Sequence, residues 1–210
     1  MRYLCTILLY VTIGYSFAQD GFVAMEEIEV FRNTLAEQTS SINSIQAEFK
    51  QEKFMSILSQ QLVANGVIQY KTPNMVKWSY TKPYKYDIVL NGKEIIINDD
   101  GKVNSFSVGS SKMFSEMNQL IVNSVQGDVL NDNKFMISYF ENKLYYLTIL
   151  KPLNKEQLGN FVEEIHVFFD KKNYSVSKLK MVEPEGDYTE LSFSNKHFNQ
   201  QISDEIFTKK

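Results

Sequence analysis

The stretch that decides the fold is "NGVIQYKTPNMVKWSYTKPYKYDIVLNGKEIIIND", residues 65–99. Its large apolar side chains recur at every second position, over residues 76–80 and again over residues 84–90. Because successive side chains of a β-strand point to opposite faces, this spacing predicts strands with one apolar, aromatic face and one polar face. Asn91-Gly92 predicts a tight hairpin between two of these strands. The stretch therefore indicates a meander of antiparallel strands.

The same period of two extends through most of the chain. It begins at Ile45, Ala47 and Phe49 and returns in later segments at 134–140, 143–152, 161–170, 175–184 and 187–194. Residues 25–39 instead place Met25, Ile28, Phe31 and Leu35 at helical spacing. Because the strands alternate apolar with polar residues, only one face of the sheet is buried. We expect an α+β domain of ten or eleven antiparallel strands, with the helices against the apolar face.

A helix with a single apolar face is predicted midway along the chain, from Ser111 to Gln126. Such a helix is short enough to act as a lid over the sheet, and its methionines suit a surface that repacks against different contents. The apolar stripe consists of Met113, Phe114, Met117, Leu120, Ile121 and Val125.

The first residues read as a targeting segment. Met1 and Arg2 precede about fifteen apolar residues, and small residues follow near Ala18. This pattern is typical of a secretory signal peptide over residues 1–18, which leaves residues 19–210 as one soluble domain. The single cysteine, Cys5, lies inside this segment and is badly placed to carry a lipid anchor. Disulfides, thiol catalysis and cysteine-bound metals are therefore excluded from the predicted mature chain.

The charge of the chain points away from nucleic acid. The sequence has 22 basic and 25 acidic residues, and removal of residues 1–18 takes away one arginine and no acid, which leaves a net charge of −4. The basic residues are scattered, so we expect no nucleic-acid partner.

No catalytic signature is recognisable. The sequence contains no G-x-S-x-G, P-loop, dinucleotide fingerprint or H-E-x-x-H motif. His166 and His197 are 31 residues apart and are expected to be ordinary surface or half-buried side chains. Glu163 and Glu164 are adjacent strand residues, so we expect them to point to opposite faces and not to share a site. We expect neither an enzyme nor a cofactor or metal.

The aromatic rows have two interpretations. The simpler one is a plain core, since aromatic residues are favoured in strands. The other is a cavity, because ten strands with one apolar face offer more surface than two helices can cover. Residues 53–64 either extend the ends of the neighbouring strands or form a mobile apolar rim at the mouth of this cavity, with Phe54, Met55 and Leu58. The predicted cavity is lined by Phe49, Val67, Val76, Trp78, Tyr80, Tyr86, Ile88, Leu90, Ile95 and Ile97.

The chain resembles the LolA family of periplasmic outer-membrane lipoprotein carriers. The pattern that carries the resemblance comprises residues 66–70, Thr72-Pro73-Asn74, residues 76–78, Pro83 and Asn91-Gly92-Lys93. Upstream, the family's S-x-x-A-x-F-x-Q segment matches Ser44, Ala47, Phe49 and Gln51. The order of helix, strands, inserted helix and strands also agrees.

The resemblance implies an unclosed antiparallel β-barrel whose apolar concave face is covered by helices. It also implies a periplasmic, monomeric carrier that moves the acyl chains of lipoproteins from an inner-membrane ABC exporter to an outer-membrane receptor. The family's arginine, which latches the lid, is replaced here by Thr72, and threonine cannot supply a multi-donor ionic contact. Lys71, Lys77 or packing alone would then hold the lid.

The identity of the cargo stays open. The segment "MVEPEGDYTELSFSN", residues 181–195, resembles a subgroup of LolA-like proteins associated with lipid-linked pigments or other acylated products. A second hypothesis is an envelope-sensing module, but those proteins carry a further carboxyl-terminal domain. An outer-membrane receptor would require a lipid-bearing cysteine. A third hypothesis is an enzyme that acts on an acylated substrate, which would show turnover.

Overall fold

The computed structural model describes residues 21–58, 60–92, 94–107, 122–123, 130, 134–154 and 160–208. The elements that can be described in full are the helix α1 (Ile28–Ser40), a short 3-10 turn, η4 (Asp204–Phe207), and twelve strands. The strands are β1 (Val23–Ala24), β2 (Ser44–Phe54), β3 (Leu62–Lys71), β4 (Met75–Lys82), β5 (Tyr86–Leu90), β6 (Glu94–Asp99), β7 (Lys102–Ser107), β8 (Phe135–Glu141), β9 (Tyr145–Pro152), β10 (Glu164–Asp170), β11 (Val176–Val182) and β12 (Tyr188–Phe198).

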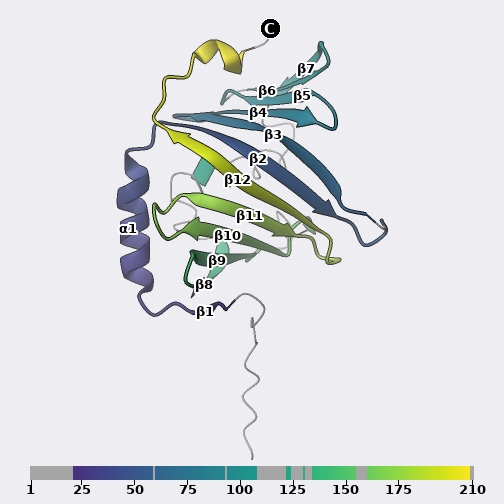
Figure 1. Cartoon of the computed structure of the whole chain (residues 1–210). Helices are drawn as coiled ribbons and strands as arrows, with labels where there is room; N and C mark the ends of the chain where they lie inside the picture. Colours follow the sequence, from purple (N-terminus) through teal and green to yellow (C-terminus); the bar gives the residue numbers. More distant parts are fainter. Residues whose placement is uncertain are drawn as a thin grey trace, which may run out of the picture.

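The strands make a single antiparallel sheet that curls without closing (Figure 1). Their order is β1-β8-β9-β10-β11-β12-β2-β3-β4-β5-β6-β7, so the β12–β2 pair joins the two ends of the chain in the middle of the sheet. The edge strands β1 and β7 do not pair with each other in the described chain. The expected α+β fold with an unclosed antiparallel sheet is confirmed, with twelve strands in place of ten or eleven.

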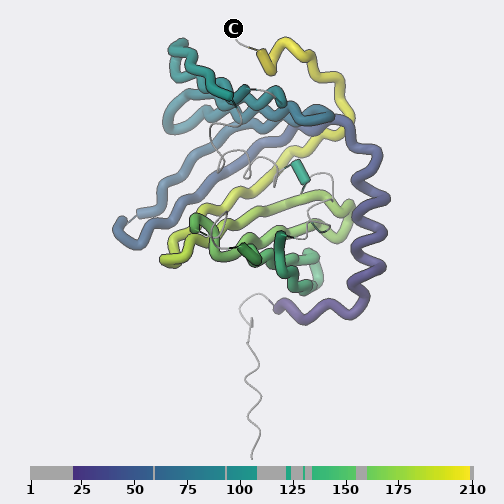
Figure 2. Tube along the Cα trace, turned by 180° about the vertical axis from the view of Figure 1, so that it is seen from behind, coloured from purple at the N-terminus to yellow at the C-terminus, as the bar shows by residue number. Residues whose placement is uncertain are grey.

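Helix α1 lies along one side of the sheet, from the β8 end to the start of β2 (Figures 1 and 2). It begins three residues later than predicted, and it buries Phe31 and Leu35 in the main core. The ring of Phe31 lies 5.6 Å from that of Phe169 on β10 and 4.7 Å from that of Tyr146 on β9. These contacts fix α1 against the part of the sheet formed by the carboxyl half of the chain.

A second, smaller core lies on the opposite face of the sheet from the main one. Ile202 and Phe207 of the carboxyl-terminal segment pack against Val89 of β5 and Ile96 of β6. The sequence shows no periodicity in this tail because its two apolar anchors come from irregular chain and from η4. The Lys71 ammonium donates to the carbonyl of Ile202 and pairs with Asp204, which holds the segment in place.

The predicted lid helix falls largely outside the described residues. Met113, Phe114, Met117, Leu120, Ile121 and Val125 lie outside them, as do residues 1–20 with the predicted signal peptide. Val122 and Asn123 are helical, and Val122 is buried in the main core together with Leu130. Among the described residues, no helix is long and apolar enough to cross a membrane.

Candidate functional site: an apolar pocket on the concave face

A row of aromatic side chains crosses strands β2 to β5 on the face of the main core. The Phe49 ring meets those of Trp78 and Tyr80 edge-on, at centroid distances of 4.9 and 5.0 Å. Tyr80 stacks on Tyr86 at 4.2 Å, and its hydroxyl donates to Gln51. Burial raises the pKa of Tyr80 far above its ordinary value, and Tyr86 adds to the increase, so this hydroxyl stays protonated. The row is a fixed wall of the interior.

The strand register places nearly all of the predicted cavity residues on this one face. Trp78 pairs with Ile68 and Ile88, and Val76 pairs with Tyr70 and Leu90. Val67 is the exception, because it pairs with Glu48 and Ser79 on the opposite face, so its predicted place in the cavity is wrong. On the concave face, the remaining predicted residues are buried (Phe49, Val76, Trp78, Leu90, Ile95) or half-buried (Tyr80, Tyr86, Ile88, Ile97).

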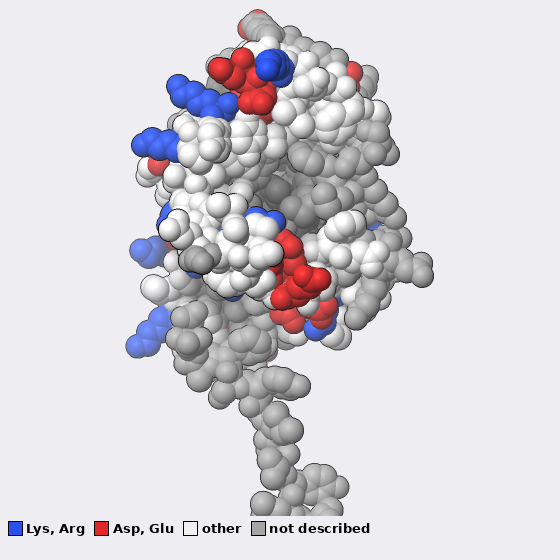
Figure 3. Space-filling model, turned by 90° about the vertical axis from the view of Figure 1, so that its right-hand side faces the viewer, with Lys and Arg blue, Asp and Glu red and all other residues white. Residues whose placement is uncertain are grey.

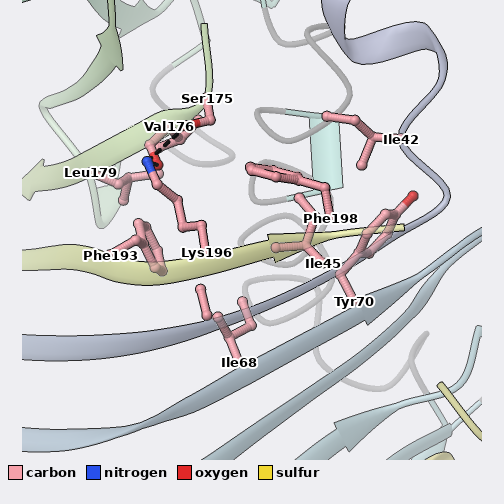
Figure 4. A pocket seen from close by; sticks show the side chains of 11 residues that line it. Ile42, Ile45, Ile68, Tyr70, Ser175, Val176, Leu179, Phe193, Lys196 and Phe198 are labelled. Atoms are coloured by element: carbon pink, nitrogen blue, oxygen red, sulfur yellow. Dashed lines mark hydrogen bonds between the residues drawn. The ribbon is translucent and has the colours of Figure 1, made fainter. Parts of the chain in front are cut away.

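A pocket opens on the same face, beside this row rather than within it (Figure 4). It contains about 600 Å³ of space not filled by protein atoms, part of it open to solvent. Four neighbouring strands, β11, β12, β2 and β3, form its walls. The lining is almost wholly apolar and consists of Ile42, Ile45, Ala47, Ile68, Tyr70, Ser175, Val176, Leu179, Phe193, Lys196 and Phe198.

The pocket adjoins Trp78 although the indole does not line it. Ile68 pairs with Trp78, and the ring of Phe193 lies 6.3 Å from the indole ring. None of the predicted cavity residues lines the pocket, and sequence reasoning missed the residues that do. Alternation identified Ile45 and Ala47 as inward-facing, but the walls contributed by β11 and β12 come from the far end of the chain.

One charged side chain borders this apolar space. The Lys196 ammonium donates to the Ser175 hydroxyl at 2.7 Å, the Val176 carbonyl at 3.1 Å and the Ser177 hydroxyl at 3.3 Å. All three acceptors are neutral, and no carboxylate among the described residues forms an ion pair with it. Burial lowers the pKa of Lys196, and the Asp170 carboxylate partly opposes this effect. Nothing in the sequence pattern singles out Lys196.

The predicted rim residues lie far from this pocket. Phe54 is the last residue of β2, whereas the pocket is lined by Ile45 and Ala47 near the start of the same strand. Phe54 stacks on Tyr188 at 5.2 Å, Met55 is half-buried and Leu58 is exposed. Together with Ile57, these residues form the tip of the β2–β3 hairpin, so they do not line the mouth of this pocket.

The lysines considered for the lid latch point away from the concave face. Lys77 pairs with Asp87 at 3.0 Å, and Lys71 holds the carboxyl-terminal segment on the outer face. The backbone N–H of Thr72 donates to the carbonyl of Asn43. Neither lysine therefore faces the concave face, and the predicted contact between Thr72 and the lid lies outside the described residues.

The paired glutamates correct another expectation. Glu163 precedes β10, so strand alternation does not separate it from Glu164, and both carboxylates meet the Lys151 ammonium, at 3.2 and 3.3 Å. His166 lies 3.0 Å from Glu164. Although burial alone would raise the pKa of Glu164, the contacts with His166 and Lys151 lower it. No group of metal-ligating side chains occurs within the described ranges.

On the face where the β2–β3 hairpin ends, acidic side chains gather in a patch below the centre of the view, and the lysines and arginines lie mainly along one edge (Figure 3). Among the described residues of this face, the lysines and arginines form no continuous basic area.

The sequence comparisons agree with this geometry. The family model "Outer membrane lipoprotein carrier protein LolA" matches residues 40–210. The chain belongs to the LolA family. An outer-membrane lipoprotein carrier protein of Helicobacter pylori strain J99 is 27% identical to it over 212 residues, which cover 97% of this chain and 89% of the relative. The family resemblance expected from the sequence is confirmed.

Solved structures share the LolA-like fold at low sequence identity. An uncharacterized conserved protein from Thermus thermophilus has a TM-score of 0.53 at 6% identity, with 88% of this chain and 95% of that chain covered. A chain of the Pseudomonas aeruginosa MucA/MucB complex has a TM-score of 0.50 at 12% identity, with 88% and 62% covered. At such identities these similarities establish the fold alone.

Proposed function

We propose that the protein is a periplasmic carrier that binds the acyl chains of lipoproteins and shuttles them from the inner to the outer membrane. The observation that carries the proposal is the apolar pocket on the concave face, bounded by four strands. An acyl chain offers only methylenes, and an almost wholly apolar lining is complementary to it. Membership of a family of lipoprotein carriers supports the same substrate class.

The release of cargo follows from the same physics. Each buried methylene contributes about 0.8 kcal/mol, so a fully enclosed chain of about sixteen carbons would gain on the order of 13 kcal/mol. A carrier that bound three such chains completely would not release them. The pocket is partly open, and Val122 already packs into the main core. Incomplete enclosure, with displacement of helix contacts by lipid, keeps the net affinity moderate.

The route implies two membrane partners. An ABC exporter in the inner membrane would load the carrier, and a receptor in the outer membrane would unload it. An enzyme acting on the acyl group would change its ligand chemically, whereas a carrier returns it unchanged, so mass spectrometry of the bound lipid separates the two.

The test measures the release of a triacylated lipoprotein from inner-membrane vesicles that contain the host's exporter. We expect the purified protein to extract the lipoprotein into a water-soluble complex and to alter the emission of Trp78 on loading. Ile68→Phe fills the pocket from its wall and should reduce release severalfold.

Val67→Phe is the matched control, because it adds a similar ring one residue away on the outer face. Circular dichroism would establish that both variants are folded. Equal release by wild type and Ile68→Phe would show that the pocket is not the acyl site. No release and no change in emission with any lipoprotein would overturn the proposed function.

A further inference from the structure

The pocket contains a charge that an acyl carrier does not need. Methylenes gain nothing from an ammonium, and even a half-buried charge without an ionic partner loses part of its hydration. Lys196 nonetheless directs its aliphatic stem along the pocket wall and its ammonium to the edge of the pocket near Ser175 (Figure 4). This position requires a reason other than stability.

The backbone of β12 is distorted at this residue. Ser194 pairs with Glu48 and His197 with Gln46, so two residues of β12, Asn195 and Lys196, lie opposite one residue of β2. Asn195 takes a left-handed conformation, with φ of 48°, and donates from its side chain to Glu48. Such a bulge inserts one residue and re-aims the side chains beyond it.

The consequence of the bulge is a change in what the strand presents to the pocket. In an unbroken strand that starts with Phe193 inside, alternation would place Lys196 and Phe198 on the outer face. With the extra residue, Phe193, Lys196 and Phe198 all face the same space (Figure 4). The bulge therefore places the Lys196 side chain in the lining of an otherwise apolar pocket.

The acceptors around the ammonium satisfy its N–H groups without neutralising its charge. Two serine hydroxyls and one backbone carbonyl accept its three N–H groups, and the longest of these contacts, to Ser177, is 3.3 Å. An oxygen from a ligand can replace this weakest contact while the other two still orient the ammonium. The charge is thus preorganised for an anion that arrives through the apolar pocket.

We propose that Lys196 binds the negatively charged head group of an acyl ligand whose chain occupies the pocket. The ligand class is an anionic acyl lipid, with a carboxylate or a phosphate as head group. This inference rests on the acyl binding of the proposed function and adds an anionic acyl lipid as a ligand class, because the acylated cysteine of a lipoprotein carries no such head group. Ester and amide carbonyls of a lipoprotein would gain less from the ammonium than an anionic oxygen, because charge-assisted hydrogen bonds are about twice as strong as neutral ones.

The test uses three probes that share a twelve-carbon chain: dodecanoate, dodecyl phosphate and dodecanol. Affinities are measured by titration of Trp78 fluorescence in wild type, in Lys196→Met and in Lys85→Met, a control on the exposed β4–β5 loop. Methionine keeps an unbranched side chain and removes the charge. We expect Lys196→Met to weaken binding of the anionic probes by about 10- to 100-fold, the range for a hydrogen bond to a charged group.

Binding of dodecanol should stay within about twofold of wild type in Lys196→Met, and Lys85→Met should bind all three probes normally. A preference for only one anion would identify the head group as carboxylate or phosphate. Equal affinity of wild type for all three probes, or an anion preference that survives in Lys196→Met, would overturn the inference and leave acyl binding intact. Failure of every probe to bind would overturn the proposed function itself.

Discussion

At the scale of single residues, Lys196 and Gly66 are two positions that their surroundings constrain. Lys196 holds a cation against an apolar pocket, and Gly66 lets two strands approach around an aromatic ring. A Cβ atom at Gly66 would lie 2.1 Å from the carbonyl oxygen of Ser79 and 2.6 Å from the ring of Phe49. Substitutions at the two positions should therefore have different effects, and each effect can be measured.

Lys196→Met should alter how stability depends on pH. Burial lowers the pKa of Lys196 below its ordinary value of 10.5, so the charged form is disfavoured in the folded protein. Below the folded pKa this cost is fully present, and it disappears as the pH rises through the folded pKa toward 10.5. Wild type should therefore gain stability relative to the variant as the pH increases through the folded pKa toward 10.5.

Urea unfolding of both proteins at several pH values gives the difference in unfolding free energy. Asp170 acts on the ammonium in the opposite direction, and Tyr70 lines the same pocket, so Asp170→Asn and Tyr70→Phe backgrounds are compared as well. A difference between wild type and Lys196→Met that does not vary with pH would contradict the lowered pKa.

Gly66→Ala should destabilise the protein by about 3 kcal/mol, the upper part of the range for overpacking a close contact. The clash with Ser79 involves backbone, which cannot rotate away. The added change Phe49→Leu, which relieves only the ring contact, should therefore recover little of the lost free energy. Chemical unfolding of the single and double variants measures both effects, and a wild-type midpoint for Gly66→Ala would refute the close approach.

At the scale of elements, strands were predictable and their irregularities were not. Period-two spacing located the strands of both halves because one face of the sheet is apolar throughout. The same rule fails in β12, since the bulge at Asn195 exchanges the two faces beyond it. Asn195 is a residue type that tolerates left-handed backbone, but this signal is too weak to set the register.

The packing of the carboxyl-terminal segment was likewise not predictable from the sequence. Ile202 and Phe207 have no period because their partners, Val89 and Ile96, are on other strands. From the sequence alone, the outward-facing apolar residues of β5 and β6 are equally compatible with solvent-exposed side chains. Only the folded chain shows that a second core covers them.

Phe207→Ala should loosen the region that this segment covers. Phe207 is 1% exposed, and removal of such a ring typically costs about 3–5 kcal/mol. We expect faster amide hydrogen exchange in β5 and β6 and smaller changes in β10, which belongs to the main core. Thr208→Ala is the control, since Thr208 is exposed. Uniform acceleration across the sheet would indicate that the two cores are one cooperative unit.

At the scale of the whole molecule, the architecture was predictable from the sequence and the position of the site was not. The aromatic row of residues 76–90 was visible as a pattern, and it forms a filled wall. The pocket lies next to it, where β11, β12, β2 and β3 meet. Ile45 and Leu179 line it from strands that are far apart along the chain, so no local pattern could bring them together.

The affinity for acyl chains should increase with chain length by less than full burial would give. Complete transfer of a methylene from water contributes about 0.8 kcal/mol, or roughly fourfold in affinity. Because the pocket is partly open, we expect a smaller increment per methylene across saturated carboxylates of eight to sixteen carbons, followed by a plateau. Fluorescence titration measures the series. A full fourfold step sustained to sixteen carbons would imply a closed cavity.

The two cores on opposite faces of one sheet have a consequence for the proposed carrier function, in which acyl chains enter and leave the inner face. In such a cycle, contacts made on the inner face cannot be the sole support of β4, β5 and β6. The tail that Lys71 holds on the outer face packs against β5 and β6 whatever the inner face contains. A carrier built in this way can exchange its ligand while the wall that receives it keeps its shape.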